Sequence, residues 1–411
     1  MKNNLRPNRL IWNDLSMDSN YSKEGKSESG ILSRDVGDNF CDLQVNSEQY
    51  SLSSLEDLLY QEVNQNRFYD SDLRNELIIE SFNYHVKNNS EYRKYVLSSP
   101  DIDLSCVNVD NIPLIPSSIF KKKLVVTPPI DGDLHKSTSS GTQGTKSIVA
   151  RDRKTMHRFL GSIGYGIRNV IDDEVTKVRV FVLSPDIEEA NDLWFSYVLG
   201  LIDLVYSSTF YVKNNVFLAD KLISDLTSIE SNHRPVVIGP PFLTKEFCER
   251  VISQSSPIDF SKNNGMVVTA GGWKRYDGKI LNREDFFTLT NKALRIKSRS
   301  NVRDFFNMVE LNTVIFECRN HKKHVPNWIR ITARDPGSMA INPSGEEGVL
   351  CFCDALPTSY PGFLLSGDFG YVKYEHRCEC GITSDVFDVT RRIKSIEARS
   401  CALKMDKGIK R

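Results

Sequence analysis

The spacing of apolar residues changes along the chain and divides it into segments of different predicted structure. Residues 1–50 are rich in Asn, Ser, Asp and Lys and hold few aliphatic side chains, which predicts a disordered or loosely ordered arm. From Ser54 onward, apolar residues recur every three or four positions, first over 55–63 and then over 73–82. This period predicts two amphipathic helices, each packed by one face.

Further along, continuous apolar runs alternate with helical patterns. The runs, typical of strands buried on both faces, are Val178–Leu183, Arg234–Gly239 and Gly265–Ala270. Helices are predicted at Lys154–Arg168, Glu188–Leu204, Ala219–Ser231 and Lys245–Gln254, and a short strand at Thr209–Val212. This alternation predicts an α/β domain with a largely parallel sheet. From about Asn312, shorter runs separated by Pro and Gly predict a smaller β-rich part.

Composition narrows the class of protein. The 411 residues include 53 Lys plus Arg and 53 Asp plus Glu, so the formal net charge is zero and gives no general attraction to nucleic acid. No apolar run reaches the roughly 20 residues of a membrane helix, and the N-terminus lacks a signal-peptide core, which predicts a cytoplasmic protein without an integral membrane segment. Nine cysteines in such a chain favour reduced thiols over a disulfide framework.

The stretch Ser137–Lys146 consists of Ser, Thr, Gly and Lys at every position except Gln143. Glycines let a backbone approach an anion, and successive amides form a nest for phosphate oxygens. The stretch lacks the Walker spacing, and it lies between two extended segments rather than between a strand and a helix. Its composition alone leaves two interpretations open, a polyphosphate-binding loop and a flexible linker.

Three further patterns follow this stretch in order. Gly271 and Gly272 come directly after a buried strand, where exposed backbone offers a surface for a flat ring. Glu310 places a carboxylate after an apolar run, and Asp368 lies on a turn flanked by glycines. Ligands of parallel sheets bind beyond the carboxyl ends of strands, so the strand end at Gly271 is a candidate place for a ligand.

This order of motifs resembles the adenylate-forming superfamily of acyl-activating ligases. Ser140–Lys146 is similar to its Ser-Gly-Thr-Thr-Gly phosphate loop, and Gly271-Gly272 to the glycine pair that abuts adenine. Asn307–Glu310 matches the Tyr-Gly-x-Thr-Glu element only at its glutamate, and Ser366–Asp368 resembles the Thr-Gly-Asp element. The resemblance implies a mixed α/β fold with largely parallel sheets, packed helices and a smaller β-rich subdomain.

Within the superfamily, the chain most resembles the acyl-protein synthetases of bacterial bioluminescence, the LuxE-like branch. The shared motifs are Gly271–Lys274, Met308–Glu310, His324–Trp328 and Cys401–Leu403. The resemblance covers about residues 125–411. Individually these motifs are loose, and their common order carries the resemblance.

The resemblance implies a role for each matching position. The donors to the ATP phosphates would be Ser140, Gly141, Thr142, Gly144 and Lys146. Glu310 would bind Mg²⁺ and Asp368 the ribose hydroxyls. An arginine near the hinge, Arg392, would contact the nucleotide, although family members have Gly before this residue and Arg391 stands there instead. Both arginines therefore stay candidates.

The implied reaction makes a carboxylate reactive. Expelling oxide from a carboxylate is not feasible near neutral pH, whereas an acyl-adenylate has a good leaving group. Attack on the α-phosphate of ATP forms that adenylate, and the protein mainly positions groups and neutralises charge. The family then passes the acyl group to a partner acyl reductase, so the resemblance implies a long-chain fatty acid substrate and a protein partner.

The acyl acceptor is expected near the end of the chain. Superfamily members usually carry a C-terminal domain of about a hundred residues, whereas only a short tail follows Arg392 here. The resemblance implies that Cys401 accepts the acyl group as a thioester, and Arg399 and Lys404 could lower the pKa of its thiol. The alternative for Cys401 is an incidental exposed thiol.

These inferences divide the chain into four parts. They are an arm over 1–50, a helical part over 51–124, an adenylating core with the nucleotide site over 125–387, and a hinge with a short tail over 388–411.

Other residues keep two interpretations each. His324 either polarises the acyl carbonyl or closes the active site, or it is a structural histidine beside Trp328. Pro240–Leu243 and Trp273 either line an apolar acyl pocket or belong to the ordinary core.

The cysteine pairs also have two interpretations. Cys351 and Cys353 with Cys378, Cys380 and His376 offer zinc ligands, but one intervening residue is shorter than zinc-knuckle spacing, and burial as small apolar residues is favoured.

Two rival functions remain at this level. One is a coenzyme A ligase of the phenylacetate type, against which the short tail counts. The other is a degenerate adenylating fold that acts as a binding subunit, because Asn307 and Val309 replace the superfamily's Gly and Thr.

Overall fold

The computed structural model describes residues 54–60, 69–99, 104–140, 145–167, 170–171, 177–255, 258–272 and 280–392. The chain separates into two units, Met1–Leu43 and Gln44–Arg411, and all of the described residues belong to the second. The arm expected over residues 1–50 lies outside the described residues.

A six-stranded sheet forms the first half of the core. Its strand order is β11-β10-β9-β8-β4-β5, and every pair is parallel except β10 with β11. The strands are β4 (Val178–Val182), β5 (Ser208–Phe210), β8 (Arg234–Gly239), β9 (Met266–Ala270), β10 (Val302–Phe306) and β11 (Ile315–Phe316). The three continuous apolar runs are confirmed as its central strands.

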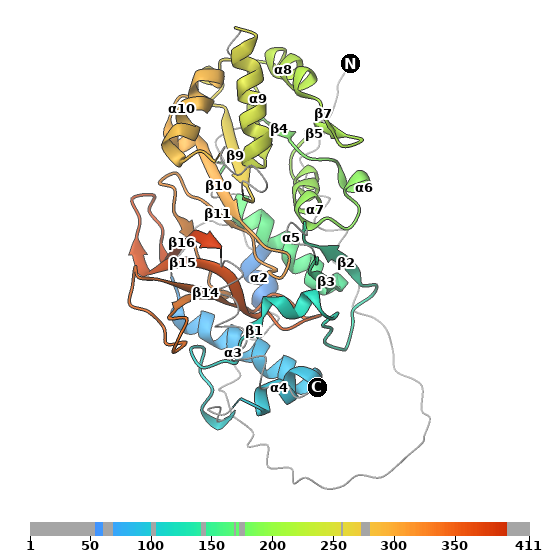
Figure 1. The fold of residues 1–411 in the computed structure, drawn as a ribbon, viewed down its shortest axis with the longest axis vertical. Helices are drawn as coiled ribbons and strands as arrows, with labels where there is room; N and C mark the ends of the chain where they lie inside the picture. Colours follow the sequence, from blue (N-terminus) through green and yellow to red (C-terminus); the bar gives the residue numbers. More distant parts are fainter. Residues whose placement is uncertain are drawn as a thin grey trace. The chain divides into compact units, whose positions relative to one another are not determined.

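Helices cover both faces of this sheet (Figure 1). One face packs against α5 (Arg153–Ile167) and α7 (Trp194–Gly200), and the other against α8 (Ala219–Thr227), α9 (Pro241–Ser253) and α10 (Arg283–Leu294). Alternate strand residues separate accordingly, since Val236 joins the first cluster and Val237 the second. Burial on both faces explains why these strands are apolar without alternation.

An antiparallel sheet forms the second half of the core, and it confirms the β-rich part that the sequence predicts. Its order is β12-β16-β15-β14-β13 with antiparallel pairs, and β1 (Ile115–Pro116) adds a parallel pair with β15. The strands are β12 (Lys323–His324), β13 (Ile329–Arg334), β14 (Glu347–Asp354), β15 (Phe363–Arg377) and β16 (Thr383–Arg392). Their buried apolar side chains, apart from Val386, belong to the same cluster as one face of the parallel sheet.

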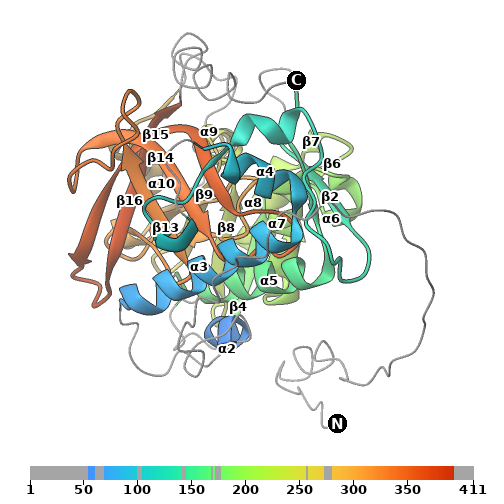
Figure 2. The ribbon, with the colours of Figure 1, turned by 90° about the horizontal axis from the view of Figure 1, so that it is seen from below.

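The N-terminal helices are part of this core. They are α2 (Ser54–Tyr60), α3 (Ser71–Asn88) and α4 (Ser90–Leu97). Helix α3 contacts β13, and α2 packs against α5 (Figure 2). Asp70 caps α3 by accepting a hydrogen bond from the Leu73 amide, as Asp does at helix starts. Among the described residues, no helix is long and apolar enough to cross a membrane.

Short elements complete the chain. They are the hairpins β2 (His135–Thr138) with β3 (Ile148–Arg151) and β6 (Val212–Lys213) with β7 (Val216–Phe217), the helix α6 (Ile187–Ala190), and the 3-10 turns Leu104–Cys106, Ser117–Lys121, Leu201–Leu204 and Arg299–Asn301.

The structure differs from the predicted elements in two places near the site. The helix expected over Glu188–Leu204 is divided into α6, α7 and a 3-10 turn, because Asn191 has φ 50° and ends α6. Asp368, which the sequence predicted on a turn, lies instead within β15, where it stands opposite Arg392 of β16.

Candidate functional site

The Gly-rich loop connects the two strands of a hairpin. β2 and β3 pair antiparallel from His135 with Arg151 to Thr138 with Ile148. At the base of the loop, the Ser139 amide donates to the Ser147 carbonyl at 3.0 Å, and the Ser147 amide donates to the Ser139 hydroxyl at 3.0 Å. The expected order of extended segment, loop and strand is confirmed.

The loop residues themselves differ in what the structure describes. Ser140 is half-buried and Lys146 is exposed, whereas Gly141, Thr142 and Gly144 lie outside the described residues. The structure therefore describes the two ends of the loop. Ser147, directly after the loop, is the residue whose side chain contacts Glu310.

Glu310 lies against the end of this loop. It belongs to the segment between β10 and β11 and is only 6% exposed. Burial raises the pKa of Glu310, while a hydrogen bond with the Ser147 side chain and the charge of Arg392 act in the opposite direction. Carboxylate oxygens are the ligands that Mg²⁺ takes from proteins, so Glu310 could hold this ion.

Asp368 and Arg392 form an ion pair near Glu310. Arg392 Nε lies 2.9 Å from Asp368 Oδ1, and the pairing of β15 with β16 puts the two residues opposite each other. Asp368, helped by the charge of Glu310, raises the pKa of Arg392. The neighbouring Arg391 instead stacks on Phe369 at 3.9 Å. Because successive strand residues face opposite sides, Arg392 rather than Arg391 faces the two carboxylates.

Arg151 is a buried residue of the site that the sequence reasoning missed. It is fully buried, and its Nε donates to Asn312 Oδ1 at 3.0 Å while Nη2 donates to the Leu311 carbonyl at 3.2 Å. Its guanidinium lies 3.6 Å from the Trp194 ring centroid. Desolvation lowers the pKa of Arg151. The sequence offered one signal, a charged residue at the end of an otherwise apolar strand.

The contacts of Arg151 fix the segment that carries Glu310. The backbone N–H of Asn312 donates to Asp354 Oδ2 at 2.9 Å. Trp194 Nε1 donates to Asn307 Oδ1 at 2.6 Å. Asn307, which departs from the superfamily's Gly, therefore has a structural partner in this chain. Burial raises the pKa of Asp354 to about 6.

Gly271 and Gly272 follow β9 at the carboxyl end of the parallel sheet. Ala270 pairs with Phe305 of β10, so the glycines lie next to the start of the Glu310 segment. Gly271 has φ 74°, and a side chain there would come within 3.4 Å of the Phe195 ring, whereas nothing lies within 4 Å of a Cβ at Gly272. Both glycines are exposed, and their contact with adenine stays a prediction.

The side chain of His324 contacts a serine and a cysteine. Its Nδ1 lies 2.7 Å from Ser384 Oγ and its Nε2 lies 3.3 Å from Cys380 Sγ. Cys351 and Cys353 are buried in β14 with 1% and 5% exposure, as the sequence favoured, and burial raises the pKa of each thiol to about 12. Cys401 and Trp273 lie outside the described residues.

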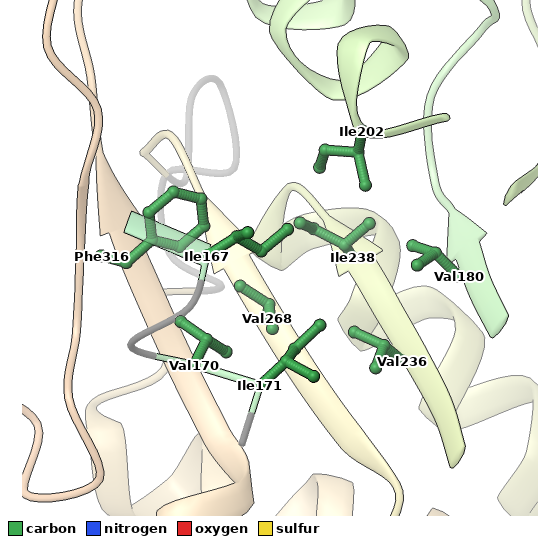
Figure 3. Close-up of a pocket in the computed structure, with 9 residues that line it drawn as sticks. All are labelled: Ile167, Val170, Ile171, Val180, Ile202, Val236, Ile238, Val268 and Phe316. Carbon is green, nitrogen blue, oxygen red and sulfur yellow. The ribbon is translucent and has the colours of Figure 1, made fainter. Parts of the chain in front are cut away.

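An apolar cavity lies between the parallel sheet and the residues that follow α5 (Figure 3). Its lining includes Ile167, Ile202, Val236 and Val268. A volume of about 10 Å³ holds no more than about one water-sized probe, so an acyl chain would enter only if side chains moved. Leu243, an expected pocket residue, packs against the other face of the sheet, which favours its core interpretation.

Comparisons with known proteins match the whole described unit. A family model described as acyl-protein synthetase, LuxE, matches residues 41–410. A long-chain-fatty-acid–luciferin-component ligase of Aliivibrio fischeri is 33% identical over 357 residues, which is 86% of this chain and 93% of that protein. The ligase of the same name from Vibrio harveyi is 33% identical over 337 residues, or 82% and 88% of the two chains.

Solved structures agree on the fold. An open conformation of 2-hydroxyisobutyryl-CoA ligase, in complex with 2-HIB-AMP and CoA, aligns with a TM-score of 0.60 at 13% identity and covers 81% of each chain. The same enzyme in its thioesterification state aligns with a TM-score of 0.59 at 14% identity, covering 79% of this chain and 69% of that one. The fold is therefore that of the adenylate-forming ligases, as the motif order implied.

Proposed function

Because the chain belongs to the LuxE family of acyl-protein synthetases, we propose that it activates a long-chain fatty acid with ATP as an acyl-adenylate. In a second step it transfers the acyl group to Cys401 and delivers it to a partner acyl reductase. The observation that carries the proposal is the meeting of the loop end at Ser147 with Glu310, Arg392 and Asp368.

In the first step, a fatty carboxylate oxygen attacks the α-phosphorus of ATP and pyrophosphate leaves. Ser140, the loop amides and Lys146 bind the phosphates, and Glu310 would hold Mg²⁺, which supplies charge neutralisation when it is bound. Asp368 accepts from the ribose hydroxyls, and Arg392 stays beside it as a counter-ion. Gly271 and Gly272 provide the flat backbone surface for adenine.

In the second step, the thiolate of Cys401 attacks the acyl carbonyl and AMP leaves with the electron pair of the broken acyl–oxygen bond. The product is an enzyme thioester, which remains reactive toward a reductase. A thiolate is a suitable nucleophile for this step, since it is far more nucleophilic than a hydroxyl near neutral pH.

Two measurements separate the steps. Incubation with labelled palmitate, ATP and Mg²⁺ is expected to label the wild-type chain covalently, and hydroxylamine is expected to remove the label. Cys401→Ser should abolish the label and keep fatty-acid-dependent exchange of pyrophosphate into ATP. The matched control is Cys106→Ser, which changes an exposed thiol and should label like the wild type.

The opposite outcomes identify the rivals. A hydroxylamine-sensitive label that persists in Cys401→Ser would overturn the thioester assignment. Release of acyl-CoA when coenzyme A is added would indicate a coenzyme A ligase instead. Absence of pyrophosphate exchange with every fatty acid tested would indicate a binding subunit.

A further inference from the structure

Three cysteines and one histidine meet where the two sheets are joined. One ligand atom from each of Cys318, His324, Cys378 and Cys380 lies within 4.8 Å of the others. The first two residues belong to the segment that runs from the end of β11 into β12, and the other two to the turn between β15 and β16. We propose that these four side chains bind one zinc ion in a structural site.

Two of the separations between these ligand atoms are close to the edges of a tetrahedral zinc site. Cys318 Sγ lies 3.8 Å from Cys378 Sγ, and Cys380 Sγ lies 3.3 Å from His324 Nε2. Zinc bonds of about 2.3 Å to sulfur and about 2.0 Å to nitrogen give tetrahedral edges of about 3.8 and 3.5 Å. The same 3.8 Å is far longer than the roughly 2.05 Å of a disulfide bond, so Cys318 and Cys378 are separate thiols.

The histidine is held in the tautomer that a metal needs. The Ser384 hydroxyl donates to the Asp385 carbonyl at 2.9 Å, so its oxygen accepts from His324 Nδ1–H at 2.7 Å. With the proton on Nδ1, the lone pair of Nε2 faces Cys380. Metal-binding histidines are usually oriented in this way by a hydrogen bond at their other nitrogen.

The two turns that carry the cysteines, one at Cys318 and one at Cys378–Cys380, are also held by hydrogen bonds of their own. The backbone N–H of Asn320 donates to Cys318 Sγ at 3.4 Å, which stabilises a thiolate at Cys318. The second turn closes through a bond from the Gly381 amide to the Cys378 carbonyl at 2.9 Å, with Gly381 at φ 95°. The turns are tied to each other by a hydrogen bond from Asn320 Nδ2 to Glu379 Oε2 at 3.0 Å.

Four protein ligands would leave no open coordination position, which is the mark of a structural zinc. On binding, the three thiols release their protons to solvent and the site gains a net charge of about −1. The ion would link the end of β11, in the parallel sheet, to the β15–β16 hairpin of the antiparallel sheet. The proposal gives His324 a role in holding the fold instead of a contact with the acyl group, and it does not depend on the proposed activity.

The test is a metal assay on the full chain, purified under reducing conditions, stripped with a chelator and reloaded. About one equivalent of zinc is expected after excess metal is removed. Cobalt(II) in its place should show the visible bands of a tetrahedral ion together with sulfur-to-metal charge transfer. Three thiols should become reactive toward a thiol reagent only after a chelator is added.

Variants assign the ligands. Cys318→Ser and Cys378→Ser are expected to weaken metal binding by at least about a hundredfold, whereas the control Cys106→Ser should bind one equivalent. His324→Cys should also keep one equivalent, now with four sulfur ligands and stronger cobalt charge transfer. If His324 instead acted on the acyl group, the His324→Cys variant would lose acylation, and the wild-type chain would fold without bound zinc.

Several results would overturn the proposal. They are a folded wild-type chain that takes up no zinc, a cobalt spectrum without charge transfer, and zinc uptake that is unchanged in Cys378→Ser. A disulfide between Cys318 and Cys378 in the reduced preparation, detected by mass, would also overturn it. Should the serine variants fail to fold, the cobalt spectrum of the wild-type chain decides alone.

Discussion

Glu310 is the residue whose protonation state the proposed chemistry depends on most directly. Its carboxyl is 6% exposed, and burial raises its pKa. A group with a raised pKa keeps its proton to higher pH than an ordinary carboxyl, and the protonated form cannot bind a cation well. Metal-dependent adenylation should therefore be sensitive to mild acid.

The prediction concerns pyrophosphate exchange as a function of pH. We expect kcat/KM to fall as the pH decreases through the raised pKa of Glu310, because this ratio reports the free enzyme. Glu310→Gln should lower the exchange rate by about a hundredfold or more and remove this titration. The exposed control Glu346→Gln should behave like the wild type, and an unaltered pH profile in Glu310→Gln would contradict the metal-binding role.

At the residue scale, the sequence predicted the carboxylates but not what holds them. Glu310 and Asp368 follow recognisable motifs, whereas Arg151 acts through carbonyl groups some 160 positions away in the chain, at Leu311 among others. Such contacts have no local pattern. The choice between Arg391 and Arg392 likewise depended on strand pairing, which a single sequence does not fix.

At the scale of elements, the β15–β16 pair carries Asp368 and Arg392, the proposed nucleotide residues, and depends on close backbone contact. A methyl group at Gly370 would come within 2.1 Å of the Asp388 carbonyl oxygen and 2.8 Å of a Leu350 methyl carbon. The register of the two strands shifts beside this glycine, so any displacement there would reach Asp368 and Arg392.

Gly370→Ala is therefore expected to lower the free energy of unfolding by about 1–3 kcal/mol, the usual cost of overpacking. Denaturant unfolding measures this change. Gly367→Ala is the matched stability control, because nothing lies within 4 Å of a Cβ at that position in the same strand. Equal stability of the two variants would show that the strands can separate at Gly370 without cost.

Element boundaries show where local pattern is overruled by tertiary structure. The helix predicted over Glu188–Leu204 has a continuous apolar period, yet Asn191 adopts a left-handed φ and redirects the chain. Thr138 explains the redirection, since its amide donates to the Asp192 carbonyl and joins this segment to the loop hairpin. The strand β16 was missed because its second half is polar and half-exposed.

At the scale of the whole molecule, the second of the two units and the family match begin at nearly the same residue. The unit starts at Gln44 and the match at residue 41. Removing residues 2–40 should thus change the free energy of unfolding by no more than about 0.5 kcal/mol and leave pyrophosphate exchange intact. A marked loss of either, measured against the full chain, would show that the first residues belong to the enzyme core.

The place where β16 ends sets a limit on how the proposed transfer of the acyl group to Cys401 can be organised. Arg392 is the last residue of the strand and lies at the proposed ribose site, and Cys401 follows nine residues later. A fully extended chain spans at most about 3.3–3.6 Å per residue, so this tether reaches about 30 Å. A thiol within that distance of the proposed ribose site would have a local concentration in or above the millimolar range. Transfer from adenylate to thiol would then be independent of enzyme concentration, and the acceptor would not have to be recruited from solution.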